Sequence, residues 1–345
     1  MPTSSPPTSS PPTPSLPAPS LPGSSLHGPV LAWYAVHARD LPWRRPGTTP
    51  WGVLVSEVML QQTPVRRVLP AYEAWLARWP TPAALAADPP GEAVRQWGRL
   101  GYPRRALRLH AASVAMVERH DGQVPSAYED LLALPGVGSY TAAAVASFAF
   151  GQRHAVLDTN VRRVLARLLD GREYPPPTLT AAERRAAEAL LPDEPSLAAR
   201  WSVAVMEIGA LVCTASSPRC DACPISRHCA WRLAGRPAYD GPPRRRQLYD
   251  GTDRQCRGRL LRVLREARDP VPRAQLEAVW PDAVQRERAL DSLVADGLVE
   301  PLDHDRYRLP QGRMVAERRP ERAGARRLAA TSPDEGYPPN RRSSS

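Results

Sequence analysis

The strongest constraint on the fold is the spacing of apolar residues in the middle of the chain. They recur about every 3.6 residues, the period of an amphipathic helix, and Pro or Gly separates one segment from the next. The segments are 53–60, 65–79, 106–117, 142–150, 161–169 and 198–212. No stretch among them alternates apolar and polar residues as a half-buried strand does. The pattern therefore predicts an all-α domain.

Changes in composition divide the 345 residues into five segments. Residues 1–25 contain nine prolines and eight serines, and residues 311–345 carry eight arginines among Pro, Gly and Ser. Both are predicted to be disordered tails, because they offer little apolar surface to bury. Residues 26–235 form the helical domain, and a linker rich in Pro, Gly and Arg spans 236–254. Residues 255–310 contain three helical stretches followed by two short strands around a turn, an order that resembles a winged helix.

The basic residues are all of one kind. The 46 cationic side chains are all arginines and face 35 acidic ones, for a formal net charge of +11. Without lysine, Schiff-base chemistry on a lysine amine is excluded. Guanidinium groups suit phosphate-bearing partners, although arginine bias in a GC-rich genome gives the same composition. With no long apolar run and no apolar leader, the sequence predicts neither a membrane protein nor a secreted one.

Four of the five cysteines lie within 17 residues, as Cys213, Cys220, Cys223 and Cys229. Such clustering is typical of metal-binding thiolates in a reducing compartment, here the cytoplasm, and not of a disulfide framework. Four thiolates bind either one zinc ion or a [4Fe–4S] cluster, and thiolate chemistry leaves both open. Cys256 receives no role.

Three further features carry candidate chemistry. Residues 134–140, Leu-Pro-Gly-Val-Gly-Ser-Tyr, connect two helical segments. The glycines permit a sharp turn, and the free N–H groups of the next helix suit a phosphate, although an ordinary helical connection looks the same. Asp158 precedes a helix, where it is either an N-cap or a catalytic carboxylate. Glu57 has apolar neighbours, and burial among them would raise its pKa and keep it protonated.

Together these motifs resemble the helix-hairpin-helix DNA glycosylases related to endonuclease III. The segments 41–44, Leu-Pro-Trp-Arg, and 56–63, Ser-Glu-Val-Met-Leu-Gln-Gln-Thr, are similar to their adenine glycosylase branch, MutY. The match covers residues 27–235 and implies a two-lobed fold with an iron–sulfur loop at 213–229, holding one [4Fe–4S] cluster. It also implies a monofunctional hydrolase of base-excision repair that releases adenine mispaired with 8-oxoguanine or guanine. Such an enzyme would be a monomer acting on double-stranded DNA in the nucleoid.

The resemblance also implies roles for single residues. Glu57 would protonate N7 of a flipped adenine, and Asp158 would stabilise the oxocarbenium-like sugar cation. Tyr140 stands where the strand-cutting relatives carry a lysine. The substrate contacts implied are Arg39, Trp43, Arg44, Leu60, Gln61, Gln62, Tyr102 and Asn160, with both glutamines and Tyr102 inserting into the base stack. The contacts implied to the DNA backbone are Leu134, Gly136, Val137 and Gly138.

The chain departs from MutY in two places. Residues 255–310 are too few for the C-terminal domain with which MutY proteins recognise 8-oxoguanine, and Val203 stands where a Glu or Gln against adenine is expected. Two alternatives stay open. One is a thymine or uracil mismatch glycosylase of the same fold. The other is a DNA-binding protein without catalysis, in which a cysteine-bound metal is purely structural.

Overall fold

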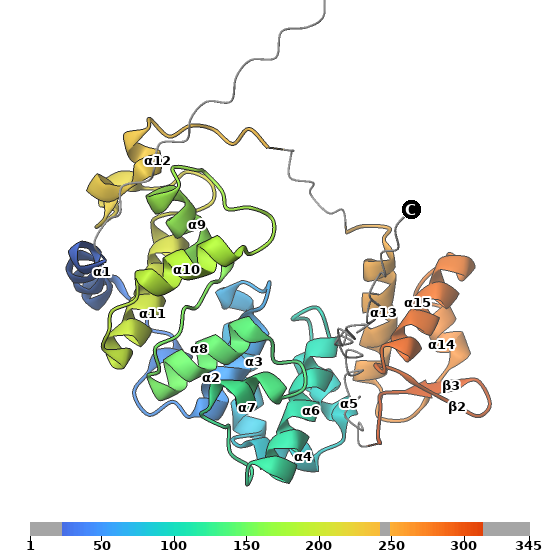
Figure 1. Ribbon diagram of the computed structural model, residues 1–345. Helices are drawn as coiled ribbons and strands as arrows, with labels where there is room; N and C mark the ends of the chain where they lie inside the picture. Colours follow the sequence, from blue (N-terminus) through green and yellow to red (C-terminus); the bar gives the residue numbers. More distant parts are fainter. Residues whose placement is uncertain (1–22, 242–248, 313–345) are drawn as a thin grey trace, which may run out of the picture. The chain divides into compact units, whose positions relative to one another are not determined.

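Helices dominate the computed structural model, which describes residues 23–241 and 249–312 (Figure 1). In the first range they are α1 (Ser24–His37), α2 (Pro50–Leu60), α3 (Val65–Arg78), α4 (Pro82–Ala87), α5 (Pro90–Trp97), α6 (Arg104–Arg119), α7 (Tyr128–Ala133), α8 (Ser139–Phe150), α9 (Thr159–Leu169), α10 (Ala181–Ala189), α11 (Pro195–Leu211) and α12 (Ala230–Leu233), with 3-10 turns η1 (Pro42–Arg44), η2 (Cys220–Ala222) and η3 (Ser226–His228). The six apolar segments fall in α2, α3, α6, α8, α9 and α11, so the predicted all-α domain is confirmed.

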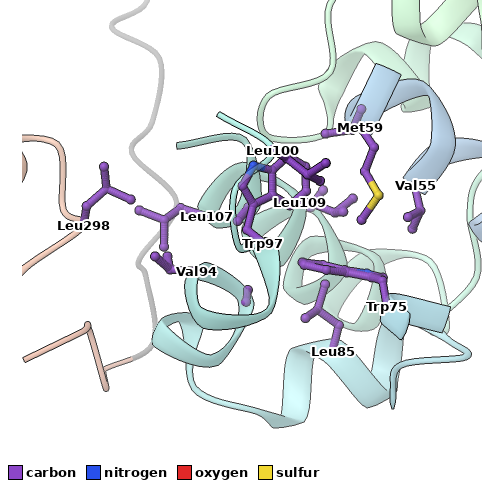
Figure 2. Close-up of a cluster of buried hydrophobic side chains, with 14 of the residues drawn as sticks. Val55, Met59, Trp75, Leu85, Val94, Trp97, Leu100, Leu107, Leu109 and Leu298 are labelled. Carbon is purple, nitrogen blue, oxygen red and sulfur yellow. The ribbon is translucent and has the colours of Figure 1, made fainter. Parts of the chain in front are cut away.

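Two large hydrophobic cores divide these helices, as a two-lobed fold requires, and a third, small cluster joins Ala143 and Ala144 of α8 to Val156. The first lies among α2 to α8 and is built around Trp75, which Figure 2 shows near Trp97. The Trp75 ring meets those of Trp79 and Trp97 edge to face, with ring centroids 4.6 and 5.6 Å apart. The second joins α1 with α9, α10 and α11 and contains Trp201 and Ile208. Edge-to-face packing is the arrangement that the charge distribution of aromatic rings favours.

The C-terminal segment, residues 249–312, contains α13 (Asp253–Glu266), β1 (Val271–Pro272), α14 (Arg273–Glu277), α15 (Ala283–Ala295), β2 (Glu300–Leu302) and β3 (Arg306–Arg308). The strands form an antiparallel sheet in the order β1-β3-β2, in which Tyr307 pairs with Val271 on one side and Pro301 on the other. Three helices and a terminal hairpin agree with the predicted winged-helix order. Strand β1 was not predicted, because two residues ending in proline show no alternation.

This segment packs against α5 and α6. Leu298 shares the first core with Val94 and Leu107 (Figure 2), and the N–H of Gly91 donates to the carbonyl of Pro310 at 2.7 Å. A separate domain at 255–310 therefore stays a prediction, because its apolar residues continue an existing core.

Two predicted boundaries move by about two residues. α1 begins at Ser24, inside the predicted tail, and α13 begins at Asp253, inside the predicted linker, because the Thr252 side chain caps it. The rest of the N-terminal tail, the middle of the linker and nearly all of the C-terminal tail lie outside the described residues. In the two described ranges, no helix combines the length and apolar character that crossing a bilayer demands.

Candidate active site

Buried side chains anchor the turn that connects α7 to α8. Leu134 and Val137 are buried in the first core, whereas Gly136 and Gly138 are exposed. Gly136 has φ +76°, and a Cβ there would lie 2.5 Å from the Cβ of Arg108, so that only glycine fits. The anchors thus present the exposed N-terminus of α8 to a ligand.

Ten of the predicted site residues line one cavity of about 800 Å³. They are Arg39, Trp43, Arg44, Glu57, Leu60, Gln61, Gln62, Tyr140, Asp158 and Asn160. They come from the segment before α2, from α2 and the turn after it, from α8, and from the cap and first turn of α9, so the fold gathers residues that are far apart in sequence. Tyr102 instead lines a neighbouring groove that shares Gln61 and Gln62 with the cavity.

Glu57 is the buried acid of this cavity. Nearly every residue of α2 is buried, and Glu57 itself is only 6% exposed. Burial raises its pKa from 4.5 to about 7, and the nearby charge of Asp158 acts in the same direction. The Tyr140 hydroxyl donates a hydrogen bond of 3.0 Å to Oε2 and, with the charge of Arg44, opposes this rise. Near neutral pH a large share of Glu57 is therefore protonated and able to donate.

Asp158 is both a helix cap and a cavity carboxylate. Its Oδ1 accepts the N–H of Val161 at 2.6 Å, and Oδ2 accepts Nδ2 of Asn160 at 2.8 Å. Burial raises the pKa of Asp158, while these hydrogen bonds lower it. A Cβ on Gly209 of α11 would lie 2.7 Å from the Cβ of Asn160, so glycine lets α11 support this turn closely. Capping thus fixes the carboxylate that faces the cavity.

Arg163 holds Asn160 in turn. Its Nη2 donates to Oδ1 of Asn160 at 2.9 Å and to the carbonyl of Gly209 at 2.6 Å. The Arg163 side chain is buried, so it orients Asn160 from the protein interior.

Glu207 of α11 is a second buried carboxylate beside the cavity, and it was not predicted from the sequence. Oε1 accepts the backbone N–H and Nε of Arg39 at 3.0 and 2.7 Å, and Oε2 forms ion pairs with Arg39 at 2.7 Å and Arg44 at 2.9 Å. Burial alone would raise the pKa of Glu207, but the two arginines lower it and keep the group charged. Val203 lies one turn earlier in α11 and lines the cavity wall.

Arg105 supports the predicted insertion residues. Gln62 and Tyr102 have φ of 53° and 47°, a left-handed conformation that residues with a Cβ seldom adopt. The buried Arg105 guanidinium donates to the carbonyls of Val58, Met59, Gln61 and Gly101. It therefore ties the end of α2 to the loop before α6 and fixes both strained residues beside each other.

The four clustered cysteines border a single small cavity, together with Arg167 and Trp231. Nη1 of Arg167 donates to Sγ of Cys213 at 3.3 Å, and its guanidinium lies 4.5 Å from the Trp231 ring centroid. In the part of the chain that the structure describes, no three Cys, His, Asp or Glu side chains are grouped as for a single metal ion. Four thiols around a shared cavity, with a cation donating to one sulfur, fit an anionic thiolate cluster.

Comparisons with known proteins give consistent results. Residues 55–188 match the model of the HhH-GPD superfamily base excision DNA repair proteins, and residues 213–229 match the iron–sulfur binding domain of endonuclease III. An adenine DNA glycosylase of Mycobacterium tuberculosis H37Rv is 54% identical over 282 residues, which cover 81% of this chain and 92% of the relative. One of Mycolicibacterium smegmatis is 54% identical over 281 residues, covering 81% and 94%. A solved thermostable thymine-DNA glycosylase superposes with a TM-score of 0.55 at 27% identity over 61% of this chain and 97% of its own.

Proposed function

Because the chain belongs to the adenine DNA glycosylases, with the endonuclease III-type [4Fe–4S] domain, we propose that its substrate is adenine mispaired with 8-oxoguanine or guanine in double-stranded DNA. The observation that carries the proposal is the pairing of Glu57, with a pKa of about 7, and Asp158 in one cavity. Two carboxyl groups in different environments can take different roles, here Glu57 as the general acid and Asp158 as the group that stabilises the sugar cation.

The proposed reaction begins when the adenine leaves the base stack and enters the cavity between Trp43 and Leu60. Protonated Glu57 gives its proton to N7, the bond between N9 and C1′ breaks, and its electron pair goes to the departing base. The Asp158 carboxylate stabilises the positive charge on the sugar. Water then adds at C1′, and its proton returns to the Glu57 carboxylate.

Strand cutting is not part of the proposed activity. Tyr140 offers a phenol where a lysine amine would form a Schiff base, and the chain contains no lysine. We therefore propose a monofunctional enzyme that leaves an intact strand with an abasic site and acts as a monomer. Its substrate places it with the nucleoid in the cytoplasm.

The function is tested with duplexes that carry A opposite 8-oxoguanine, A opposite G, or T opposite G, with alkali to cut abasic sites. The proposal expects adenine release from the first two and strand breaks only after alkali. Release of thymine alone would point instead to a mismatch glycosylase like the solved structural relative. Release of no base would favour a DNA-binding protein without catalysis.

Replacing Tyr140 by Phe is expected to shift the pH dependence of adenine release. The Tyr140 hydroxyl lowers the pKa of Glu57 by donating a hydrogen bond to the carboxylate. Losing that bond raises the pKa, so the falling limb of the rate profile moves to higher pH, by about one unit for a bond of typical strength. Single-turnover rates measured from pH 6 to roughly pH 9 check this. A limb that stays in place would contradict the assigned hydrogen bond.

The chain's own residues for the [4Fe–4S] cluster are Cys213, Cys220, Cys223 and Cys229. A cluster held by these four cysteines would link the end of α11 to the start of α12 and would stabilise the loop between them. That loop carries Arg219 and Arg227, both exposed, which we propose contact DNA phosphates.

Replacing Cys223 by Ser is expected to remove most of the bound iron and to lower the melting temperature, because a cluster ligand contributes to folding. Iron analysis, visible absorption and thermal unfolding measure both effects. Cys256→Ala is the matched control, since Cys256 is buried in the first core and lies outside the cluster cavity. Full iron content in the Cys223 variant, or its loss in the control, would overturn the ligand assignment.

A further inference from the structure

A groove of about 1100 Å³ adjoins the active-site cavity and shares Gln61 and Gln62 with it. One wall is the loop 98–103 with the first turns of α6, and the other is α13 of the C-terminal segment. Ten arginines and two acidic residues line it. We call it the arginine groove. So dense a positive lining favours a polyanion.

α13 turns a basic face to this groove and an apolar face to the core. Arg254 and Arg262 are exposed on the groove side, whereas Leu260 and Leu264 are buried behind them. Gly258 also lines the groove, and a Cβ there would meet only the Tyr249 hydroxyl within 4 Å. Glycine is less favourable than alanine in a helix interior, and here it leaves the helix backbone open to close approach.

Part of the positive charge is not neutralised by the residues that the structure describes. Arg104 and Arg257 share Asp296, at 3.0 and 2.5 Å. Among residues 23–241 and 249–312, no carboxylate forms an ion pair with Arg99, Arg108 or Arg254. The Arg254 guanidinium instead lies 4.9 Å from the centroid of the Tyr102 ring. An external anion would balance these charges, and phosphate oxygens match the guanidinium donors.

We infer that the arginine groove binds the sugar–phosphate backbone of the strand complementary to the one that carries the adenine. The inference rests on the proposed function, which places the adenine and its strand at the cavity of Glu57. Gln62 and Tyr102 would then fill the space left in the base stack. Gln61, Gln62 and Tyr102 all line the arginine groove, so a duplex opened by these residues would have its complementary strand on the groove side. The C-terminal segment thereby contacts the strand that carries the opposite base.

Salt dependence of binding tests the proposed binding of phosphates. Glu57→Gln serves as the background, so that the duplex with A opposite 8-oxoguanine stays intact during titrations at several salt concentrations. The double variant Arg254→Ala with Arg262→Ala is expected to reduce the slope of log K against log salt by about two, one for each phosphate that is no longer neutralised. Arg268→Ala, an exposed arginine outside the groove, is the matched control and should leave the slope unchanged. An unchanged slope in the double variant would overturn the inference.

Cross-linking tests which strand lies in the groove. The Arg254→Cys variant, again with Glu57→Gln, is mixed with duplexes that carry a thiol-tethered phosphate on one strand or the other. The tether thiol is supplied as a mixed disulfide, so that the thiolate of the introduced cysteine displaces its leaving thiol by exchange. We expect this exchange with the complementary strand and none with the protein that lacks the Arg254 change. Cross-linking to the adenine strand instead would contradict the inference. Failure of the proposed function would appear separately, as no base release by the unaltered chain.

Discussion

Replacing Glu57 by Gln is expected to slow single-turnover release of adenine by roughly 10²–10⁴-fold, the usual contribution of a general acid. Glutamine keeps the size of the side chain and accepts the Tyr140 hydrogen bond, but it has no proton to give at N7. Glu118→Gln, on the exposed surface of α6, is the matched control and should release adenine at the parent rate. A Glu57→Gln variant with near-normal activity would remove Glu57 from the mechanism.

The pH dependences of the rate and of the stability distinguish a variant that has lost its general acid from one that has lost its fold. With a pKa of about 7, Glu57 is the active acid below that pH, so the parent rate should fall as the pH rises through 7. The folded pKa also exceeds the ordinary 4.5, so Glu57 contributes stability that is fully present below about pH 4.5, falls as the pH rises, and is lost once the pH passes about 7. Glu57→Gln removes the buried charge. Chemical denaturation at pH 8 to 9 should accordingly find this inactive variant more stable than the parent chain.

The long helices and the cavity residues were accessible from sequence for different reasons. Periodicity alone located six helices of 11 to 17 residues, among them α2 and α11, but not α1, of 14 residues. It gave no signal for α4, of six residues, or for α12, of four, because they are too short to show a period. The equally short α7 was expected only as the helical segment before residues 134–140. α10 is rich in Ala, Glu and Arg and was also missed, although its capping box, Thr180 with Glu183, is a readable start signal.

The residues of the active-site cavity were predicted from the resemblance to a known family, because that resemblance is carried by local sequence motifs. Glu207 and Arg105 have no such pattern. Their roles depend on what α11 and α6 meet in three dimensions, which are Arg39 and Arg44 in one case and the end of α2 in the other. A charged residue inside an apolar stretch of a helix is the signal that was available for Glu207, since a buried charge requires a partner. Arg105 lies among other basic residues at the start of α6 and offers no such signal.

The arginine groove, like Glu207 and Arg105, has no local sequence pattern that predicts it. The excess of arginine is visible in composition, but a genome-wide bias explains it equally well. Only the structure shows that ten of these residues line one groove, where α13 faces the loop before α6. A binding surface differs from a compositional bias in that its arginines lie together at one place, whatever their total number in the chain.

Replacing Asp158 by Asn separates the two roles of this residue. Asparagine caps helices as well as aspartate does, so the variant should unfold at nearly the parent temperature. Adenine release is expected to slow by roughly 10²–10³-fold, because the neutral amide no longer stabilises positive charge on the sugar. Asp282→Asn, at the cap of α15, is the matched control for a cap change without effect on activity.

The residual activity of Asp158→Asn carries a second signature. The charge of Asp158 raises the pKa of Glu57, so its removal lowers that pKa and moves the falling limb of the rate profile to lower pH. Tyr140→Phe moves the same limb in the opposite direction. Opposite shifts of the falling limb in the two variants would show that Asp158 and Tyr140 both act on Glu57, as expected from their places in the cavity. A limb that does not respond to Asp158→Asn would mean that the ionised form of Asp158 is not electrostatically coupled to Glu57, and the division of roles between the two carboxyl groups would have to be abandoned.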